Sequence, residues 1–185
     1  ANKVRVNPGN IGGENGVKKV ADCLKMHKIP VRIGANTGSI EKEFLNKFGR
    51  NEFALVESAL AEVSAFEKFG VNDIVISVKA SDAPLTVRAY RLLSARTNYP
   101  LHIGVTEAGT EEMAVVKSSA ALGSLLIDGI GDTLRISVTD DPVKEVKIAK
   151  RLLRAVGLDK KFVNVISCPT CGRCRWNSME LAKKV

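Results

Sequence analysis

Short apolar segments with the character of strands alternate with longer helical segments along this chain of 185 residues. Each apolar segment has the length of a buried strand, and the segments between them repeat apolar residues at every third and fourth position. Such alternation is typical of β-α-β units that form a parallel sheet. The predicted strands are residues 4–7, 31–36, 73–79, 101–107 and 133–138, and a sixth apolar run at 162–166 is predicted to be another strand.

The segments between the strands predict helices over 52–68, 84–96 and 111–127, and Asp140-Asp141-Pro142 is typical of the start of another helix. Polar residues gather in the loops after the strands, which favours a (β/α) barrel of the TIM type. A flavodoxin-like open sheet is the alternative. Five complete units are fewer than the eight that close a barrel, so we expect an α/β fold that forms part of one.

Each of the five predicted strands carries a charged residue at a position where burial should disfavour a charge. Because side chains alternate along a strand, the apolar neighbours would face the helices and the charges would face the opposite side. A buried charge without a partner costs several kcal/mol. An internal network of salt bridges is one interpretation, and a site for a polyanion of phosphate type is the one that we favour. The charged residues are Arg5, Arg32, Lys79, Glu107 and Arg135.

Arginine suits a phosphate because its planar fork donates two parallel hydrogen bonds. Four polar residues lie within four positions of the charges and complete the candidate site: Asn7, Asn36, Ser81 and Ser137. Glu107 is the lone acid of the set, so it is either a proton-transfer group or the partner of one of the cations. The glycine-rich loop at 8–13 is a weaker phosphate-binding signal, and His102, early in its strand, is predicted to be structural.

The composition narrows the class of partner. The net charge of +8 is compatible with an anionic ligand. Aromatic residues make up only 5% of the chain and no dense basic run accompanies them, so we do not expect nucleic acid as a partner. No apolar run approaches the roughly 20 residues of a membrane helix. We therefore predict a cytoplasmic protein without a membrane segment.

Three of the four cysteines, Cys168, Cys171 and Cys174, follow one another at C-x2-C-x2-C spacing. Two residues between thiols allow both sulfurs to face one metal centre. The spacing leaves an iron–sulfur cluster and a zinc ion open, and a disulfide is disfavoured in a cytoplasmic chain.

Six segments resemble, in order, the motifs of the 4-hydroxy-3-methylbut-2-enyl diphosphate synthase family. They are VRVNPGN (4–10), VRIGAN (31–36), SVKASD (77–82), GVTEAG (104–109), GIGDTLRIS (129–137) and ISCPTCGR (166–173). The resemblance implies an oxidoreductase of isoprenoid biosynthesis by the non-mevalonate pathway. The reaction is the reductive ring opening and dehydration of 2-C-methyl-D-erythritol 2,4-cyclodiphosphate to 4-hydroxy-3-methylbut-2-enyl diphosphate. The resemblance also implies a [4Fe–4S] cluster and either ferredoxin or flavodoxin as the electron donor. It further implies a homodimer in which the cluster of one subunit closes over the barrel of the other.

The resemblance also assigns roles to residues. Glu107 would be the acid near the departing hydroxyl, and Cys168 and Cys171 would be cluster ligands. The family's third cysteine and its glutamate ligand lie downstream of this stretch, so Cys174 matches neither of them. The residues that would hold the cyclic diphosphate are Arg5, Asn7, Arg32, Asn36, Lys79, Ser81, Arg135 and Ser137.

In domain terms, the resemblance implies that residues 1–160 are the C-terminal part of a TIM-type barrel, about its last five strands, and that 161–185 begin an iron–sulfur domain. We therefore expect the chain to be part of a longer protein. Two alternatives stay open at this point: a zinc-stabilised phosphate-binding barrel fragment without catalysis, and an aldolase that forms a Schiff base on Lys79.

Overall fold

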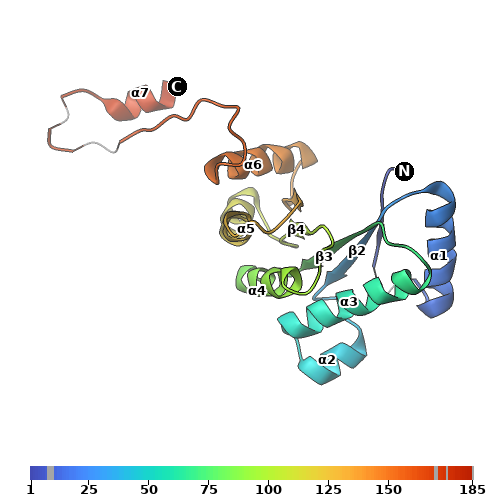
Figure 1. The fold of residues 1–185 in the computed structure, drawn as a ribbon. Helices are drawn as coiled ribbons and strands as arrows, with labels where there is room; N and C mark the ends of the chain where they lie inside the picture. The colour runs from blue at the N-terminus through green and yellow to red at the C-terminus, as the bar shows by residue number, and fades with distance from the viewer. Residues whose placement is uncertain (8–10, 169–170, 174, 185) are drawn as a thin grey trace.

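The computed structural model describes residues 1–7, 11–168, 171–173 and 175–184, in which five strands alternate with helices (Figure 1). The strands are β1 (Val4–Val6), β2 (Val31–Asn36), β3 (Ile74–Lys79), β4 (His102–Gly104) and β5 (Thr133–Arg135). The helices are α1 (Gly13–His27), α2 (Lys42–Phe48), α3 (Glu52–Lys68), α4 (Ala83–Ser94), α5 (Glu111–Ile127), α6 (Pro142–Ala155) and α7 (Ser178–Lys184).

All the strands run parallel and follow one another in sequence order. The strands β1, β2 and β3 form one ladder and β4 and β5 form another. A single parallel bridge between Ile76 and Leu101 joins the two ladders. The predicted α/β fold with parallel strands is therefore confirmed, and in the described part of the chain β1 and β5 do not meet to close a barrel.

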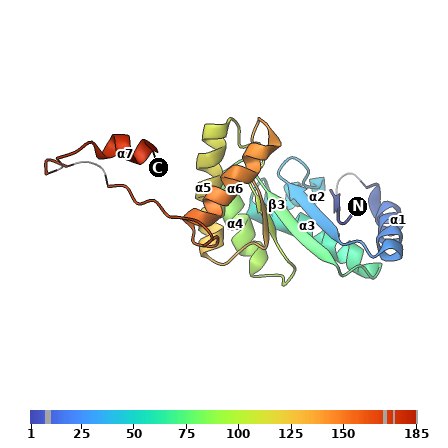
Figure 2. The same cartoon turned by 90° about the horizontal axis from the view of Figure 1, so that it is seen from above.

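The helices cover one face of the curved sheet. In Figure 1, α1, α3, α4 and α5 follow one another around its outer side, and the view from above in Figure 2 shows the same arrangement. The core lies between these helices and the sheet, where Ile33, Ile76 and Ile103 pack against Phe66 and Leu122, all fully buried. This packing fixes which way each strand faces, because a shift of one residue would turn the apolar set away from the helices.

The helix boundaries follow the capping signals in the sequence. The helices α3 and α5 span the predicted residues, and α4 begins one residue earlier and ends two residues earlier than the predicted 84–96. The side chains of Asn51, Asp82 and Asp141 accept hydrogen bonds from backbone N–H groups in the first turns of α3, α4 and α6. These caps satisfy donors that a helix start otherwise leaves unpaired.

A tyrosine replaces sheet pairing at the seam between β3 and β4. Tyr90 of α4 is fully buried, and its hydroxyl donates to the His102 carbonyl oxygen (2.7 Å). The same hydroxyl accepts from the Val78 N–H (3.2 Å). Because burial disfavours the charged form, the pKa of Tyr90 lies well above its ordinary value. One neutral side chain thus satisfies two backbone groups that no ladder reaches.

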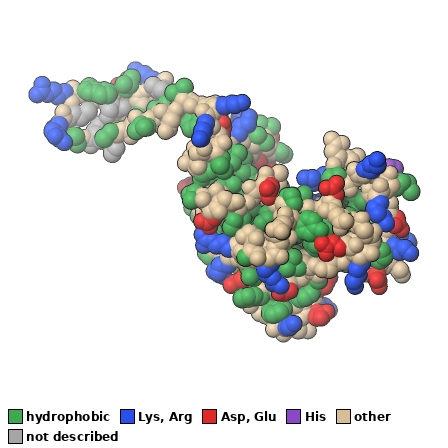
Figure 3. All heavy atoms as spheres, viewed as in Figure 1, with side chains coloured by type: hydrophobic (Ala, Val, Ile, Leu, Met, Phe, Trp, Pro, Cys, Tyr) green, Lys and Arg blue, Asp and Glu red, His purple; other side chains and the backbone are tan. Residues whose placement is uncertain are grey.

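The C-terminal segment differs from its prediction. Residues 162–166 form no strand, and Val163 and Ile166 are 87% and 89% exposed. Figure 3 shows hydrophobic side chains at the surface along this segment, which leads away from the sheet. An apolar run becomes a buried strand only where a neighbouring strand pairs with it, and no described residue does so here. The predicted boundary at 160/161 and the iron–sulfur domain stay predictions. Among the described residues, no helix has both the length and the apolar character to cross a membrane.

Candidate functional site

The cations predicted from the sequence lie on the face of the sheet opposite the helices, which we call the inner face. The register pairs Arg5 with Arg32 across β1 and β2, and Asn36 with Lys79 across β2 and β3. Residues in register share a face, as do residues two apart on one strand. Arg135 lies on the same face of β5, opposite Gly104 of β4. The strands thus deliver four cations from four different strands to one surface.

These cations are close enough to perturb one another. Burial and the neighbouring Arg5 lower the pKa of Arg32, and Arg135 adds to the effect. Lys79 is only 7% exposed. Its burial, followed by the charges of Arg32, Arg135 and Arg5, lowers its pKa to about 7. An amine in this state gains a proton readily when an anion arrives, because a nearby negative charge favours the charged form.

Two glycines make room for the cationic side chains. A Cβ atom at Gly34 would lie 2.8 Å from Arg5 Nε and 3.1 Å from Ser77 Oγ. A Cβ atom at Gly104 would lie 3.1 Å from Lys79 Nζ and 2.9 Å from the carbonyl oxygen of Arg135. Arg5 also donates to the Gly34 carbonyl oxygen at 3.2 Å. The sequence analysis did not single out these glycines. Gly34 lies two residues after Arg32 and Gly104 two residues after His102, and this spacing places each glycine on the same face of its strand as that residue.

His102, which the sequence predicted to be structural, lies on the inner face of β4, two residues before Gly104. Its Nδ1 lies 2.8 Å from Thr133 Oγ1, and its Nε2 is buried without a hydrogen-bond partner among the described residues. Burial, followed by the charges of Lys79 and Arg32, lowers the pKa of His102 to about 3, so the ring is neutral. A cavity of about 300 Å³ adjoins it, lined by Lys3, Arg5, Arg32, His102 and Thr133.

The remaining polar residues of the predicted site lie at the C-terminal edge of the sheet. Asn7 directly follows β1, and its Oδ1 is buried without a hydrogen-bond partner among the described residues. Ser81 and Ser137 each lie two residues beyond a strand and are half-buried. Arg135 reaches Ser137 Oγ at 3.5 Å and the Glu145 carboxylate at 3.8 Å. The edge therefore offers hydroxyl and amide groups beside the cations.

Glu107 lies outside the strand that was predicted to carry it, because β4 ends at Gly104. Its side chain is exposed, and its backbone has a φ of 53°. This left-handed conformation costs a residue with a Cβ about 1–2 kcal/mol. Within the described part of the chain Glu107 forms no ion pair, so its alternative role as the partner of a cation is not observed. Strain of this kind at a strand end motivates a functional hypothesis.

The cysteines do not join the inner face. Cys168 and Cys171 are exposed in a stretch without regular secondary structure, in the segment that leads away from the sheet (Figure 1). Cys174 lies outside the described residues. Among those that are described, no group of three or more potential ligands could hold a metal ion. The donor set thus supplies two thiols of the four ligands that an iron–sulfur cluster usually takes.

Comparisons with known proteins agree with the barrel architecture. A family model described as the GcpE TIM-barrel domain matches residues 1–150. A 4-hydroxy-3-methylbut-2-en-1-yl diphosphate synthase (flavodoxin) from Caldanaerobacter subterraneus subsp. tengcongensis is 54% identical, over 100% of this chain and 52% of the relative. Proteins with the same name from Fusobacterium nucleatum and Geobacter sulfurreducens are each 52% identical, over 99% and 98% of this chain and 52% of each relative.

The chain spans about half the length of these curated relatives. Among solved structures, the N-acetylneuraminic acid synthetase of Leptospira borgpetersenii in complex with citrate is similar with a TM-score of 0.50 and 13% identity. This similarity covers 89% of this chain and 54% of that one, and it concerns the fold alone.

Proposed function

Because the chain belongs to the GcpE family of 4-hydroxy-3-methylbut-2-en-1-yl diphosphate synthases, we propose that it carries the substrate-binding face for that family's reaction. The substrate is 2-C-methyl-D-erythritol 2,4-cyclodiphosphate. Its ring opens at a C–O bond, two electrons and two protons are consumed, and one water leaves. The product is 4-hydroxy-3-methylbut-2-enyl diphosphate.

The observation that supports this proposal most directly is the set of four cations on one face, where burial and the neighbouring arginines lower the pKa of Lys79 to about 7, so that only part of its amine is protonated in the free protein. A cyclic diphosphate carries one negative charge on each phosphate. Arg5, Arg32 and Arg135 offer charge-assisted hydrogen bonds to those oxygens. Lys79 takes up a proton as the anion binds and adds a fourth positive charge.

The polar groups at the strand ends hold the rest of the substrate. Asn7, Asn36, Ser81 and Ser137 donate to ring and hydroxyl oxygens, and Glu107 protonates the hydroxyl that leaves as water. A [4Fe–4S] cluster would supply the two electrons, with Cys168 and Cys171 as two of its ligands. The names of the relatives support flavodoxin as the electron donor. A homodimer and a cytoplasmic location complete the proposal.

Titration calorimetry with the cyclic diphosphate tests the binding step. We expect Arg32→Met to weaken binding by tenfold or more, because a hydrogen bond to a charged group contributes about 1.5–3 kcal/mol. Arg151→Met removes the same charge from an exposed position on α6 and serves as the matched control. Equal affinities of the two variants would show that the inner face is not the binding site.

Two substitutions of Glu107 distinguish its effect on turnover from its effect on stability. Both are made in a chimera in which this chain replaces the matching half of the Caldanaerobacter relative. Glu107→Gln should lower turnover by about 10²–10⁴-fold, as expected for loss of a general acid, and should leave stability unchanged. Glu107→Gly should lower turnover equally and raise the free energy of unfolding by about 1 kcal/mol, because glycine tolerates the φ of 53°.

Turnover is measured with the chimera after its reduction, and the free energy of unfolding is measured by urea unfolding. An inactive unsubstituted chimera that is folded and loaded with iron and sulfide would contradict the proposed reaction. Full activity of Glu107→Gln would remove Glu107 from the proton-transfer step and leave the binding face as it stands.

The low pKa of Lys79 also favours a second candidate, a Schiff-base aldolase, since an unprotonated amine attacks carbonyl groups. Borohydride reduction in the presence of a small aldehyde or keto acid phosphate tests this reading. A mass adduct that disappears in Lys79→Met would support it.

A further inference from the structure

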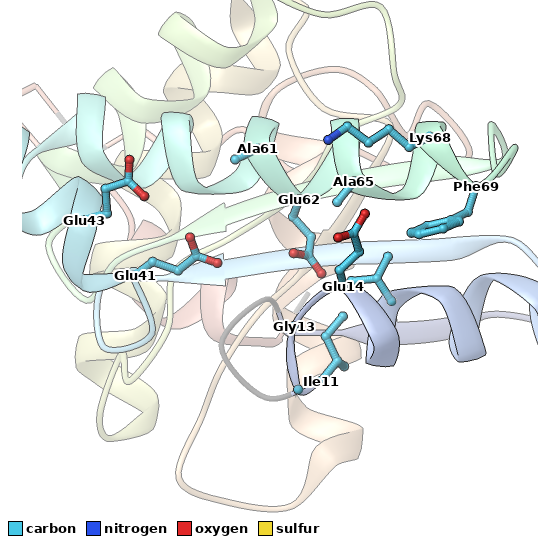
Figure 4. A pocket seen from close by; sticks show the side chains of 12 residues that line it. Ile11, Gly13, Glu14, Glu41, Glu43, Ala61, Glu62, Ala65, Lys68 and Phe69 are labelled. Carbon is cyan, nitrogen blue, oxygen red and sulfur yellow. The ribbon is translucent and has the colours of Figure 1, made fainter.

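A second cavity lies among the helices, away from the inner face. It has a volume of about 790 Å³ and is lined by residues of α1, α2 and α3 and of the adjoining loops (Figure 4). The volume falls in the range of small-molecule sites. None of the inner-face residues borders it, so any ligand here would be separate from the proposed diphosphate.

A buried carboxyl group with an unpaired oxygen, as far as the described residues go, points into this cavity. Glu62 of α3 is 6% exposed, and its Oε1 accepts no hydrogen bond from any described residue. Figure 4 shows its carboxyl group directed into the space between α1, α2 and α3. A buried acceptor left unsatisfied costs about 1–3 kcal/mol. The structure therefore leaves a place for a donor that the described residues do not supply.

The cavity is strongly acidic although the chain as a whole has a net charge of +8. Glu14 of α1, Glu41 at the start of α2 and Glu43 of α2 join Glu62 in the lining, and Lys68 is the one cation among the described lining residues. None of the four carboxyl groups forms an ion pair within the described residues. Burial and then the Glu41 carboxylate raise the pKa of Glu62 to about 7. A cation between these two groups would offset the repulsion between them and favour the charged form of Glu62.

The rest of the lining is apolar. Val17 of α1 is buried, and Ile11, Ala65 and Phe69 pack against the same core. The carboxyl groups are not grouped as metal ligands, since no described cluster of three could hold a metal ion. A ligand that matches both halves of the cavity has a cationic head and a hydrocarbon body.

We propose that this cavity binds an aliphatic primary amine, with its ammonium group between Glu41 and Glu62 and its hydrocarbon chain against Val17 and Phe69. The ammonium group has three N–H donors, which suit the unpaired Glu62 oxygen and a second carboxylate. The hydrocarbon chain leaves water on entering the apolar part of the cavity, which makes affinity depend on chain length.

Calorimetric titration at pH 8 with butylamine, hexylamine and octylamine tests this site. Each added methylene should tighten binding by up to about fourfold, the factor expected for full burial of one CH₂ group. Glu62→Gln keeps the shape of the side chain, removes its charge and should weaken hexylamine binding at least tenfold. Glu41→Gln, at a half-buried position, should have an effect in the same direction.

Glu112→Gln is the matched control, because it removes one carboxylate from an exposed position of α5. Affinities that do not change with chain length, or that fall equally in all three variants, would indicate diffuse attraction to surface acids and overturn the proposal. Absence of binding at millimolar amine would overturn it as well. Binding of the cyclic diphosphate by Glu62→Gln should be unchanged, so this site and the inner face succeed or fail separately.

Discussion

Replacement of Lys79 by methionine is expected to raise the free energy of unfolding by about 2–4 kcal/mol at pH 7, where each pKa unit corresponds to 1.36 kcal/mol. The amine is 7% exposed among Arg5, Arg32 and Arg135, so its charged form is disfavoured in the folded protein. Methionine fills a similar volume without a charge. The same variant should bind the cyclic diphosphate at least a hundredfold more weakly, because methionine cannot take up the proton that gives Lys79 its positive charge on binding.

The pH dependence of this gain follows from the direction of the shift. The pKa of Lys79 is about 7 in the folded protein and about 10.4 in an unfolded chain. Between these values the unfolded chain binds more protons, so the stability of the unsubstituted protein rises with pH. The advantage of Lys79→Met is therefore complete below pH 7 and shrinks as the pH approaches 10.

Urea unfolding at pH 6, 7, 8, 9 and 10 measures this difference. Lys18→Met, which removes an exposed lysine of α1, is the control and should change stability by less than about 0.5 kcal/mol at every pH. A Lys79→Met variant that is less stable than the parent at pH 7 would mean that the amine is paired and charged in the folded state.

Much of the fold was accessible from sequence periodicity, because the helix-facing residues and the helix caps are local signals. Ile33 and Ile76 flank the charged or small residues of their strands, and this alternation alone predicted which face carries the cations. Asn51, Asp82 and Asp141 marked helix starts through their own side chains. Such features need no knowledge of distant parts of the chain.

The errors concern features that depend on contacts between distant residues. The strand predicted up to Glu107 ends at Gly104, because only its first residues find pairing partners in β5. The run at 162–166 is as apolar as a strand and has none. Gly34 and Gly104 look like ordinary strand residues until the side chains of Arg5 and Lys79 are placed above them. The acidic cavity around Glu62 likewise combines three elements that are separate in sequence.

Tyr90→Phe is expected to lower the free energy of unfolding by about 2–4 kcal/mol, since an unsatisfied buried group costs about 1–3 kcal/mol and the change leaves two of them. The hydroxyl bonds the Val78 N–H and the His102 carbonyl oxygen, at the seam where β3 and β4 share a single bridge. The side chains of Lys79, which follows Val78, and of His102 lie on the inner face next to this seam. Loosening of the seam should therefore weaken diphosphate binding several-fold without removing any contact to the ligand.

Tyr99→Phe is the matched control for Tyr90→Phe, because its hydroxyl donates to Glu67 at an exposed position (2.8 Å), where water can replace it. That variant should lose less than about 1 kcal/mol. Hydrogen exchange of the Val78 amide gives a local readout, and its protection should fall in Tyr90→Phe and remain in Tyr99→Phe. A Tyr90→Phe protein as stable as the parent, with Val78 still protected, would mean that β3 and β4 pair directly once the hydroxyl is gone. The two ladders would then form one sheet without the tyrosine, and the seam would not control the relative positions of Lys79 and His102.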